Sequence, residues 1–143
     1  MAAPLRVLII EDSPDDVTLL IRELRRGGYD VTWQVVSRRE EMQAALARQP
    51  WDLVFSDHAM PAFSAPGALR LLREGGHDIP LVIVSGITAE AAQAMLKELG
   101  AHDYVVKSDL SRLVPVVRRQ LQETEERRAR RWAGRKRQRE TDE

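Results

Sequence analysis

Residues 7–13 read Val-Leu-Ile-Ile-Glu-Asp-Ser, an unbroken apolar run that ends in two acids and a serine. Four apolar residues are too few for a helix, and a continuous run is typical of a strand buried on both faces, as in a parallel sheet. Similar runs follow at Leu53–Phe55, Leu81–Val84 and Tyr104–Val106. A fifth stretch, Val31–Val36, is interrupted by polar residues and fits an edge strand.

Helical patterns with recognisable ends lie between these runs. Ser13 is a favourable N-cap, Pro14 suits the first helical position, and Gly27-Gly28 ends that helix. The other boundaries are predicted by a capping box of Ser37 and Glu40, a stop at Gly75-Gly76, a cap at Thr88, a stop at Gly100 and a helix start between Asp109 and Pro115. Strand and helix therefore alternate five times, which predicts an α/β fold with a doubly wound parallel sheet.

Composition limits the class of protein further. The 143 residues suit one domain, with 43% hydrophobic and 31% charged residues, and no apolar run approaches the ~20 residues that span a bilayer. There is no cysteine, so disulfides and cysteine zinc sites are excluded. The first residues lack the apolar segment of a signal peptide. We therefore expect a cytoplasmic protein that does not enter a membrane.

The net charge of zero conceals two unlike regions. Residues 1–117 carry 12 Lys/Arg against 16 Asp/Glu, whereas residues 118–143 carry 10 against 6. We predict a domain over residues 1–121 and a basic helical tail or linker over 122–143, as an extension of the fifth helix. The basic run 135–139 could attract phosphates, but no helix-turn-helix or aromatic platform accompanies it, so specific nucleic-acid binding is not predicted.

Chemically active side chains follow four of the predicted strands. Ligand sites in open α/β sheets lie beyond the carboxyl ends of the strands. The residues at those ends are Glu11 and Asp12, then Asp57, then Ser85, then Lys107. Three carboxylates at one rim would repel one another unless a cation lay among them, and hard oxygen ligands suit Mg²⁺.

This set of groups is suited to phosphoryl transfer. Asp57 could attack phosphorus to form an aspartyl phosphate, while Lys107 and the Ser85 hydroxyl could stabilise the transferred group. Asp15 and Asp16 are interpreted instead as acids that stabilise the amino end of the first helix.

Four segments together resemble the receiver domain of response regulators, over roughly residues 5–121. They are Val-Leu-Ile-Ile-Glu-Asp-Ser (7–13), Asp-Leu-Val-Phe-Ser-Asp-His-Ala-Met-Pro (52–61), Pro-Leu-Val-Ile-Val-Ser-Gly (80–86) and Gly-Ala-His-Asp-Tyr-Val-Val-Lys (100–107). The resemblance implies a flavodoxin-like, five-stranded sheet of order 2-1-3-4-5. It also implies these roles: phosphoacceptor Asp57, metal ligands Glu11, Asp12, Asp57 and the backbone carbonyl of Ala59, phosphate-binding Lys107, switch hydroxyl Ser85 and switch aromatic Tyr104.

The resemblance implies a signalling switch rather than an enzyme, with self-phosphorylation and autodephosphorylation as its only chemistry. It would take phosphate from a sensor histidine kinase or a phosphotransfer protein, with Mg²⁺ as cofactor. Tyr104 would then move into the space behind Ser85. The responding surface would be the fourth helix, fifth strand and fifth helix, which could face a downstream domain or a second copy.

Several alternatives stay open. The chain could be the receiver of a hybrid histidine kinase or of another multidomain signalling protein. A phosphatase of the haloacid dehalogenase type is disfavoured, because Ala59 stands where that class has a second acid. A flavodoxin-like cofactor binder is disfavoured since Glu11 and Asp12 would repel a phosphate, and the complete set of site residues argues against an interaction module without phosphorylation. Ser108 stands where receivers usually have proline, and we expect a trans peptide before it.

Overall fold

One parallel sheet organises the chain in the computed structural model, which describes residues 2–57, 63, 65–86 and 88–142. Its strands are β1 (Ala3–Ile10), β2 (Tyr29–Val36), β3 (Leu53–Asp57), β4 (Leu81–Ser85) and β5 (Asp103–Val106). They lie in the order β2-β1-β3-β4-β5, and every adjacent pair is parallel. The predicted sheet order is confirmed, and so is the edge position of the second strand.

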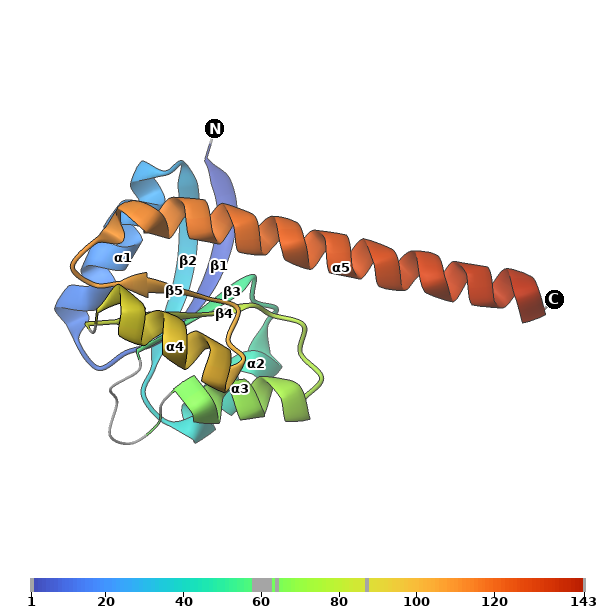
Figure 1. The fold of residues 1–143 in the computed structure, drawn as a ribbon, viewed down its shortest axis with the longest axis horizontal. Helices are drawn as coiled ribbons and strands as arrows, with labels where there is room; N and C mark the ends of the chain where they lie inside the picture. Colours follow the sequence, from blue (N-terminus) through green and yellow to red (C-terminus); the bar gives the residue numbers. More distant parts are fainter. Residues whose placement is uncertain (1, 58–62, 64, 87, 143) are drawn as a thin grey trace.

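Helices alternate with the strands and cover both faces of the sheet (Figure 1). They are α1 (Pro14–Arg26), α2 (Arg39–Arg48), α3 (Ala65–Glu74), α4 (Ala89–Leu99) and α5 (Leu113–Asp142), the last preceded by a 3₁₀ turn, η1 (Leu110–Arg112). The side chains of α1 and α5 pack on one face, and those of α2, α3 and α4 on the other. Within the described residues, no helix combines the length and the apolar character needed to cross a membrane.

The two-sided cover explains why the strands read as unbroken apolar runs. In β1, Leu8 and Ile10 belong to the core beneath α2 and α3, whereas Val7 and Ile9 belong to the core beneath α1 and α5. All four side chains are at most 1% exposed. Each such burial contributes about 1.5–3 kcal/mol relative to an exposed side chain. We therefore expect a polar substitution at any of these four positions to destabilise the fold.

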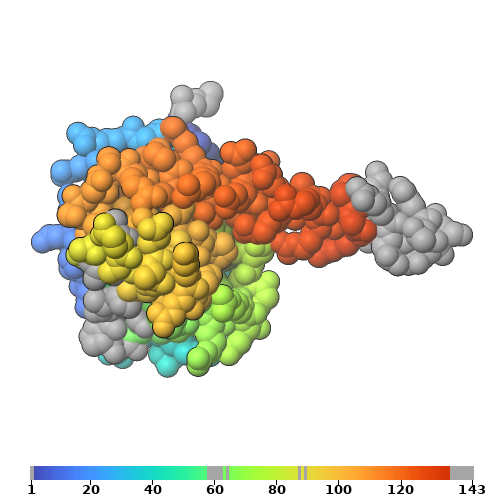
Figure 2. All heavy atoms as spheres, in the orientation of Figure 1, coloured from blue at the N-terminus to red at the C-terminus, as the bar shows by residue number. Residues whose placement is uncertain are grey.

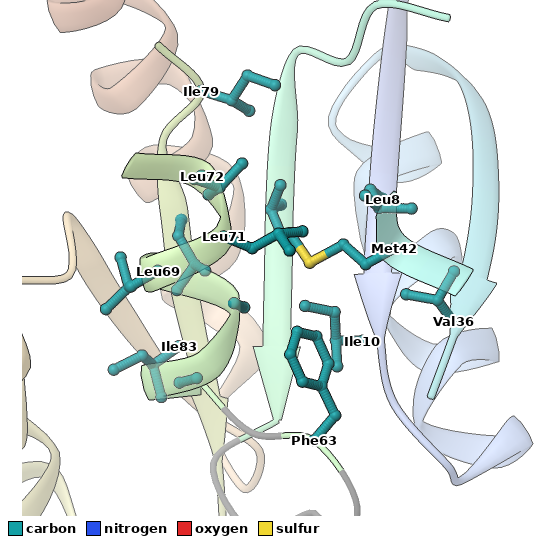
Figure 3. Close-up of a cluster of buried hydrophobic side chains, with 14 of the residues drawn as sticks. Leu8, Ile10, Val36, Met42, Phe63, Leu69, Leu71, Leu72, Ile79 and Ile83 are labelled. Carbon is teal, nitrogen blue, oxygen red and sulfur yellow. The ribbon is translucent and has the colours of Figure 1, made fainter. Parts of the chain in front are cut away.

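The core beneath α2 and α3 joins residues that are distant in sequence. Figure 3 shows Met42 of α2 and Leu71 of α3 pointing toward one another above the sheet, with Phe63 lying below them beside Ile10. Met42 is fully buried, although α2 has only one further buried residue, Ala45. The packing of α2 therefore depends mainly on Met42.

The helix caps were predicted correctly in two cases and wrongly in one. Ser13 caps α1 by accepting a hydrogen bond from the Asp16 amide, and Thr88 caps α4 in the same way. The capping box of Ser37 and Glu40 is wrong: the amide and hydroxyl of Ser37 both donate to Glu41, each at 3.1 Å. The backbone at residue 38 is still extended, so α2 begins one residue later than expected and the acid at its third position is Glu41.

Helix α5 is far longer than the others and projects out of the body (Figures 1 and 2). Its 30 residues correspond to about 45 Å. Beyond residue 121 it still contacts the body through polar groups. Thr124 is buried, and Asp78 accepts a hydrogen bond from Arg127 and forms an ion pair with Arg131. The extended helix is confirmed, while the domain boundary at residue 121 stays a prediction.

Candidate functional site

The carboxyl ends of the parallel strands bring the expected side chains to one edge of the sheet. Glu11 and Asp12 follow β1, Asp57 ends β3, Ser85 ends β4 and Lys107 follows β5. The order β2-β1-β3-β4-β5 puts β3 between β1 and β4, so Asp57 lies at the centre of this edge. The peptide between Lys107 and Ser108 is trans, as expected.

Lys107 is the centre of a compact charge cluster. Its ammonium nitrogen lies 3.1 Å from Glu11 Oε2, 2.7 Å from Asp16 Oδ2 and 3.0 Å from Asp57 Oδ2. Partial burial alone would lower the pKa of Lys107, but the hydrogen bonds to the three carboxylates outweigh it and hold that pKa well above its usual range. Lys107 is therefore a permanent cation beside Asp57.

Asp16 is the site residue that the strand-end reasoning missed. It lies in the first turn of α1, where acids ordinarily stabilise the helix dipole. Its amide donates to Ser13 while its carboxylate accepts the shortest of the Lys107 hydrogen bonds. Because α1 starts directly at this edge of the sheet, its first turn faces the site, and that topology was the only available signal.

Glu11 is held by contacts to both of its carboxylate oxygens. Oε1 accepts hydrogen bonds from the amides of Asp12 and Ser13, at 3.1 and 3.2 Å, and Oε2 pairs with Lys107. The side chain is only 2% exposed. Burial raises the pKa of Glu11, and neighbouring Asp57 raises it further, against the opposing effects of Lys107 and the Ser13 amide. A further cation beside Glu11 would stabilise the charged carboxylate and lower this pKa.

The carboxylates fit a hard divalent cation. Glu11, Asp12 and Asp57 each offer one oxygen, and these three oxygens all lie within 4.8 Å of one another. Asp12 is exposed, which leaves room for water molecules, and Mg²⁺ characteristically keeps several waters while binding few carboxylates. The Ala59 carbonyl, the fourth expected ligand, lies outside the described residues.

The two expected switch residues, Ser85 and Tyr104, are both buried. Ser85 is 2% exposed, and its backbone carbonyl accepts a hydrogen bond from the Lys107 amide at 2.7 Å. Tyr104 is 9% exposed and belongs to the core beneath α2, α3 and α4. The Arg112 guanidinium stands 4.8 Å from the centre of its ring. Tyr104 is thus already in an inward position, which the sequence expectation reserved for the phosphorylated protein.

Comparison with known proteins identifies the family of the chain. The family model described as the response regulator receiver domain matches residues 7–118. The chain is 30% identical over 122 residues to the DNA-binding transcriptional regulator NtrC of Rhizobium meliloti, a match that covers 85% of this chain and 25% of that protein. It spans less than half the length of each of the curated relatives compared.

Two solved structures extend the comparison. One is the receiver domain of the sensor histidine kinase PA1611 of Pseudomonas aeruginosa, with a magnesium ion coordinated in its active-site cleft. It is 24% identical, has a TM-score of 0.67, and the match covers 83% of this chain and 98% of that one. The other is the receiver domain of a signal transduction histidine kinase from Syntrophus aciditrophicus, with 27% identity, a TM-score of 0.67, and coverage of 83% and 91%.

Proposed function

The chain belongs to the response regulator receiver domain family, and from that premise we propose that Asp57 accepts a phosphoryl group from a histidine kinase or a phosphotransfer protein. The observation that carries the proposal is the position of Asp57, whose Oδ2 lies 3.0 Å from the Lys107 ammonium and whose carboxylate belongs to the metal-compatible cluster. A buried carboxylate with these neighbours combines a nucleophile, a fixed cation and room for a metal ion.

The chemistry follows from the charges at the site. An Asp57 oxygen forms a bond to phosphorus while the bond from phosphorus to the donor's imidazole nitrogen breaks, and the leaving imidazole recovers a proton. Lys107 remains charged throughout and stabilises the phosphoryl oxygens once its contact with Asp57 is replaced. Bound to Glu11, Asp12 and Asp57, Mg²⁺ would offset carboxylate charge and polarise the phosphoryl group.

The same proposal includes a switch that involves Ser85. Ser85 ends β4, and its carbonyl holds the Lys107 amide at the end of β5. A phosphoryl group that accepts a hydrogen bond from the Ser85 hydroxyl would therefore move the end of β4 and, through this backbone hydrogen bond, the end of β5. A downstream domain or a second copy would read the surface formed by α4, β5 and α5.

A second candidate assigns the same chemistry to a receiver within a larger histidine kinase. Two features favour it: the 27% identity to the receiver of a signal transduction histidine kinase, and the extension of α5 beyond the body. Both candidates predict the same phosphorylation site and differ only in the kind of domain that α5 would connect to the receiver.

Intact-mass measurement after incubation with acetyl phosphate and Mg²⁺ tests the proposal. The wild type should gain one phosphoryl group and Asp57→Asn none. Asp30→Asn, which removes an exposed carboxylate from β2, is the matched control and should label like the wild type. Equal labelling of Asp57→Asn and Asp30→Asn would contradict the assignment.

A further inference from the structure

A groove of about 890 Å³ lies between α1 and β2, to one side of the phosphorylation site. Its floor is apolar and consists of Val17, Ile21, Trp33 and Val35. Arginines of α1 line one end, and Glu11 and Asp12 line the other. Neither the receiver chemistry nor the switch uses the apolar part of this groove.

The part of the floor that β2 provides is exposed because α1 covers only the first half of that strand. Val31 is buried beneath α1, while Trp33 and Val35, which follow on the same face of the strand, are 41% and 40% exposed. They are two of the four large hydrophobic side chains that are exposed in the described part of the chain. Among the described strands β2 pairs only with β1, so no further strand shields this end of the sheet.

The charges along the groove form a gradient. Arg22, Arg25 and Arg26 lie in the last two turns of α1, whereas Glu11 and Asp12 precede its first turn. The Arg25 guanidinium stands 5.3 Å from the centre of the Trp33 ring, which keeps the cation above the apolar floor. Arg26 pairs with Glu23, and Arg22 is exposed. An anion is therefore attracted to the arginine end and repelled from the other.

From these features we propose that the groove binds a small organic anion with a flat apolar body, such as an aromatic carboxylate or sulfonate. The apolar body would lie on Trp33 and Val35, and the anionic group would lie between Arg22 and Arg25. The volume falls within the range of about 300–1,000 Å³ that is usual for small-molecule sites.

Two fluorescent dyes with matched ring systems test the charge requirement. Anilinonaphthalene sulfonate carries the anion, and phenylnaphthylamine has the same rings without it. The full chain should bind the sulfonate with one-to-one stoichiometry. Arg22→Gln with Arg25→Gln should weaken sulfonate binding by about tenfold, because charge-assisted hydrogen bonds are lost, and should change binding of the neutral dye little. Arg48→Gln with Arg70→Gln removes two exposed arginines elsewhere and should change neither.

Trp33→Ala should weaken both dyes, with far-ultraviolet circular dichroism as the check on folding. Amide shifts in the wild type, independent of any variant, should concentrate at Val17, Ile21, Trp33 and Val35. Absence of sulfonate binding, equal affinity for the two dyes, full affinity in a folded Trp33→Ala, or shifts centred elsewhere would each overturn the proposal. None of these outcomes depends on phosphorylation of Asp57.

Discussion

The ammonium of Lys107 lies 2.7 Å from the Asp16 carboxylate, closer than its 3.0 Å distance from Asp57. Asp16 therefore shares the cation with Asp57, the proposed phosphoacceptor. The lysine is held between α1 and β3, and the carboxylate of Asp16 adds to the negative charge that surrounds Glu11 and Asp57.

The first prediction concerns this sharing. Asp16→Asn should weaken Mg²⁺ binding by roughly threefold to tenfold, because it removes one negative charge a few ångströms from the metal ligands and lets Lys107 pair more fully with them. Calorimetric titration with Mg²⁺ measures the change. Tighter binding in the variant would contradict the role given to Asp16.

A second prediction separates the metal ligands from their neighbours in sequence. Asp12→Ala should abolish both Mg²⁺ binding and labelling by acetyl phosphate, because it removes one of the three clustered oxygens. Asp15→Ala removes an exposed acid three residues away and should do neither. Removal of Mg²⁺ from the wild type with EDTA should abolish labelling, as Asp12→Ala does. Labelling that continues in EDTA would contradict the assignment of the metal site.

Beryllofluoride, which mimics the phosphoryl group, should produce amide shifts that extend from Asp57 through Ser85 into α4, β5 and α5. Tyr104 is already buried, so its ring should move little and the larger shifts should lie in α4 and the end of β4. Ser85→Ala should confine the shifts to the neighbourhood of Asp57. The same extended pattern in Ser85→Ala would show that the hydroxyl does not couple the site to that surface.

The pH dependence of stability should report on His102. Burial lowers its pKa below the ordinary 6.5, and its Nδ1 accepts a hydrogen bond from the Leu81 amide at 3.0 Å. Between this lowered pKa and 6.5 the unfolded chain therefore binds a proton that the folded protein does not, so the contribution of His102 to the free energy of unfolding decreases as the pH falls.

Denaturant titrations between pH 7 and pH 5 test this dependence. His102→Gln, which cannot titrate, should flatten the slope. His77→Gln, at an exposed histidine, is the matched control and should preserve it. Identical slopes in the two variants would exclude His102 as the cause.

The last prediction concerns the attachment of α5. Asp78→Ala removes the carboxylate that Arg127 and Arg131 share, so amide exchange in α5 beyond residue 122 should accelerate. The pairs are partly exposed, so the loss in global stability should be about 1 kcal/mol or less.

Truncation of the chain after Gln122 should preserve labelling of Asp57 by acetyl phosphate. A truncated chain that fails to fold would mean that α5 contributes more to the core than its polar contacts indicate.

The fold was predictable because its signals are local. Each apolar run, cap and glycine stop lies within a few residues, and the residue after each strand is known once the strand is known. The helix starts were less certain, as the shift from Glu40 to Glu41 at α2 illustrates. A side chain one position further on can make the same hydrogen bonds when the preceding backbone stays extended.

Two further contacts that the sequence did not predict join distant residues. Asp16 meets Lys107 across 91 positions, and Arg127 meets Asp78 across 49. In each case a charged residue also has an ordinary explanation, as a helix-dipole acid or a solvated arginine. Only the three-dimensional arrangement distinguishes these explanations, because surface charges are too numerous for pairing to be inferred from residue type.

The geometry of α5 has a mechanical consequence. The helix is held near its start, where Arg119 pairs with Asp103 of β5, and again where Arg131 pairs with Asp78. A rigid helix held at two points resists tilting relative to the sheet. Between Arg119 and Arg131 the helix runs for about 18 Å, so a tilt of about 10° at the first contact would move Arg131 by roughly 3 Å and break its pair with Asp78.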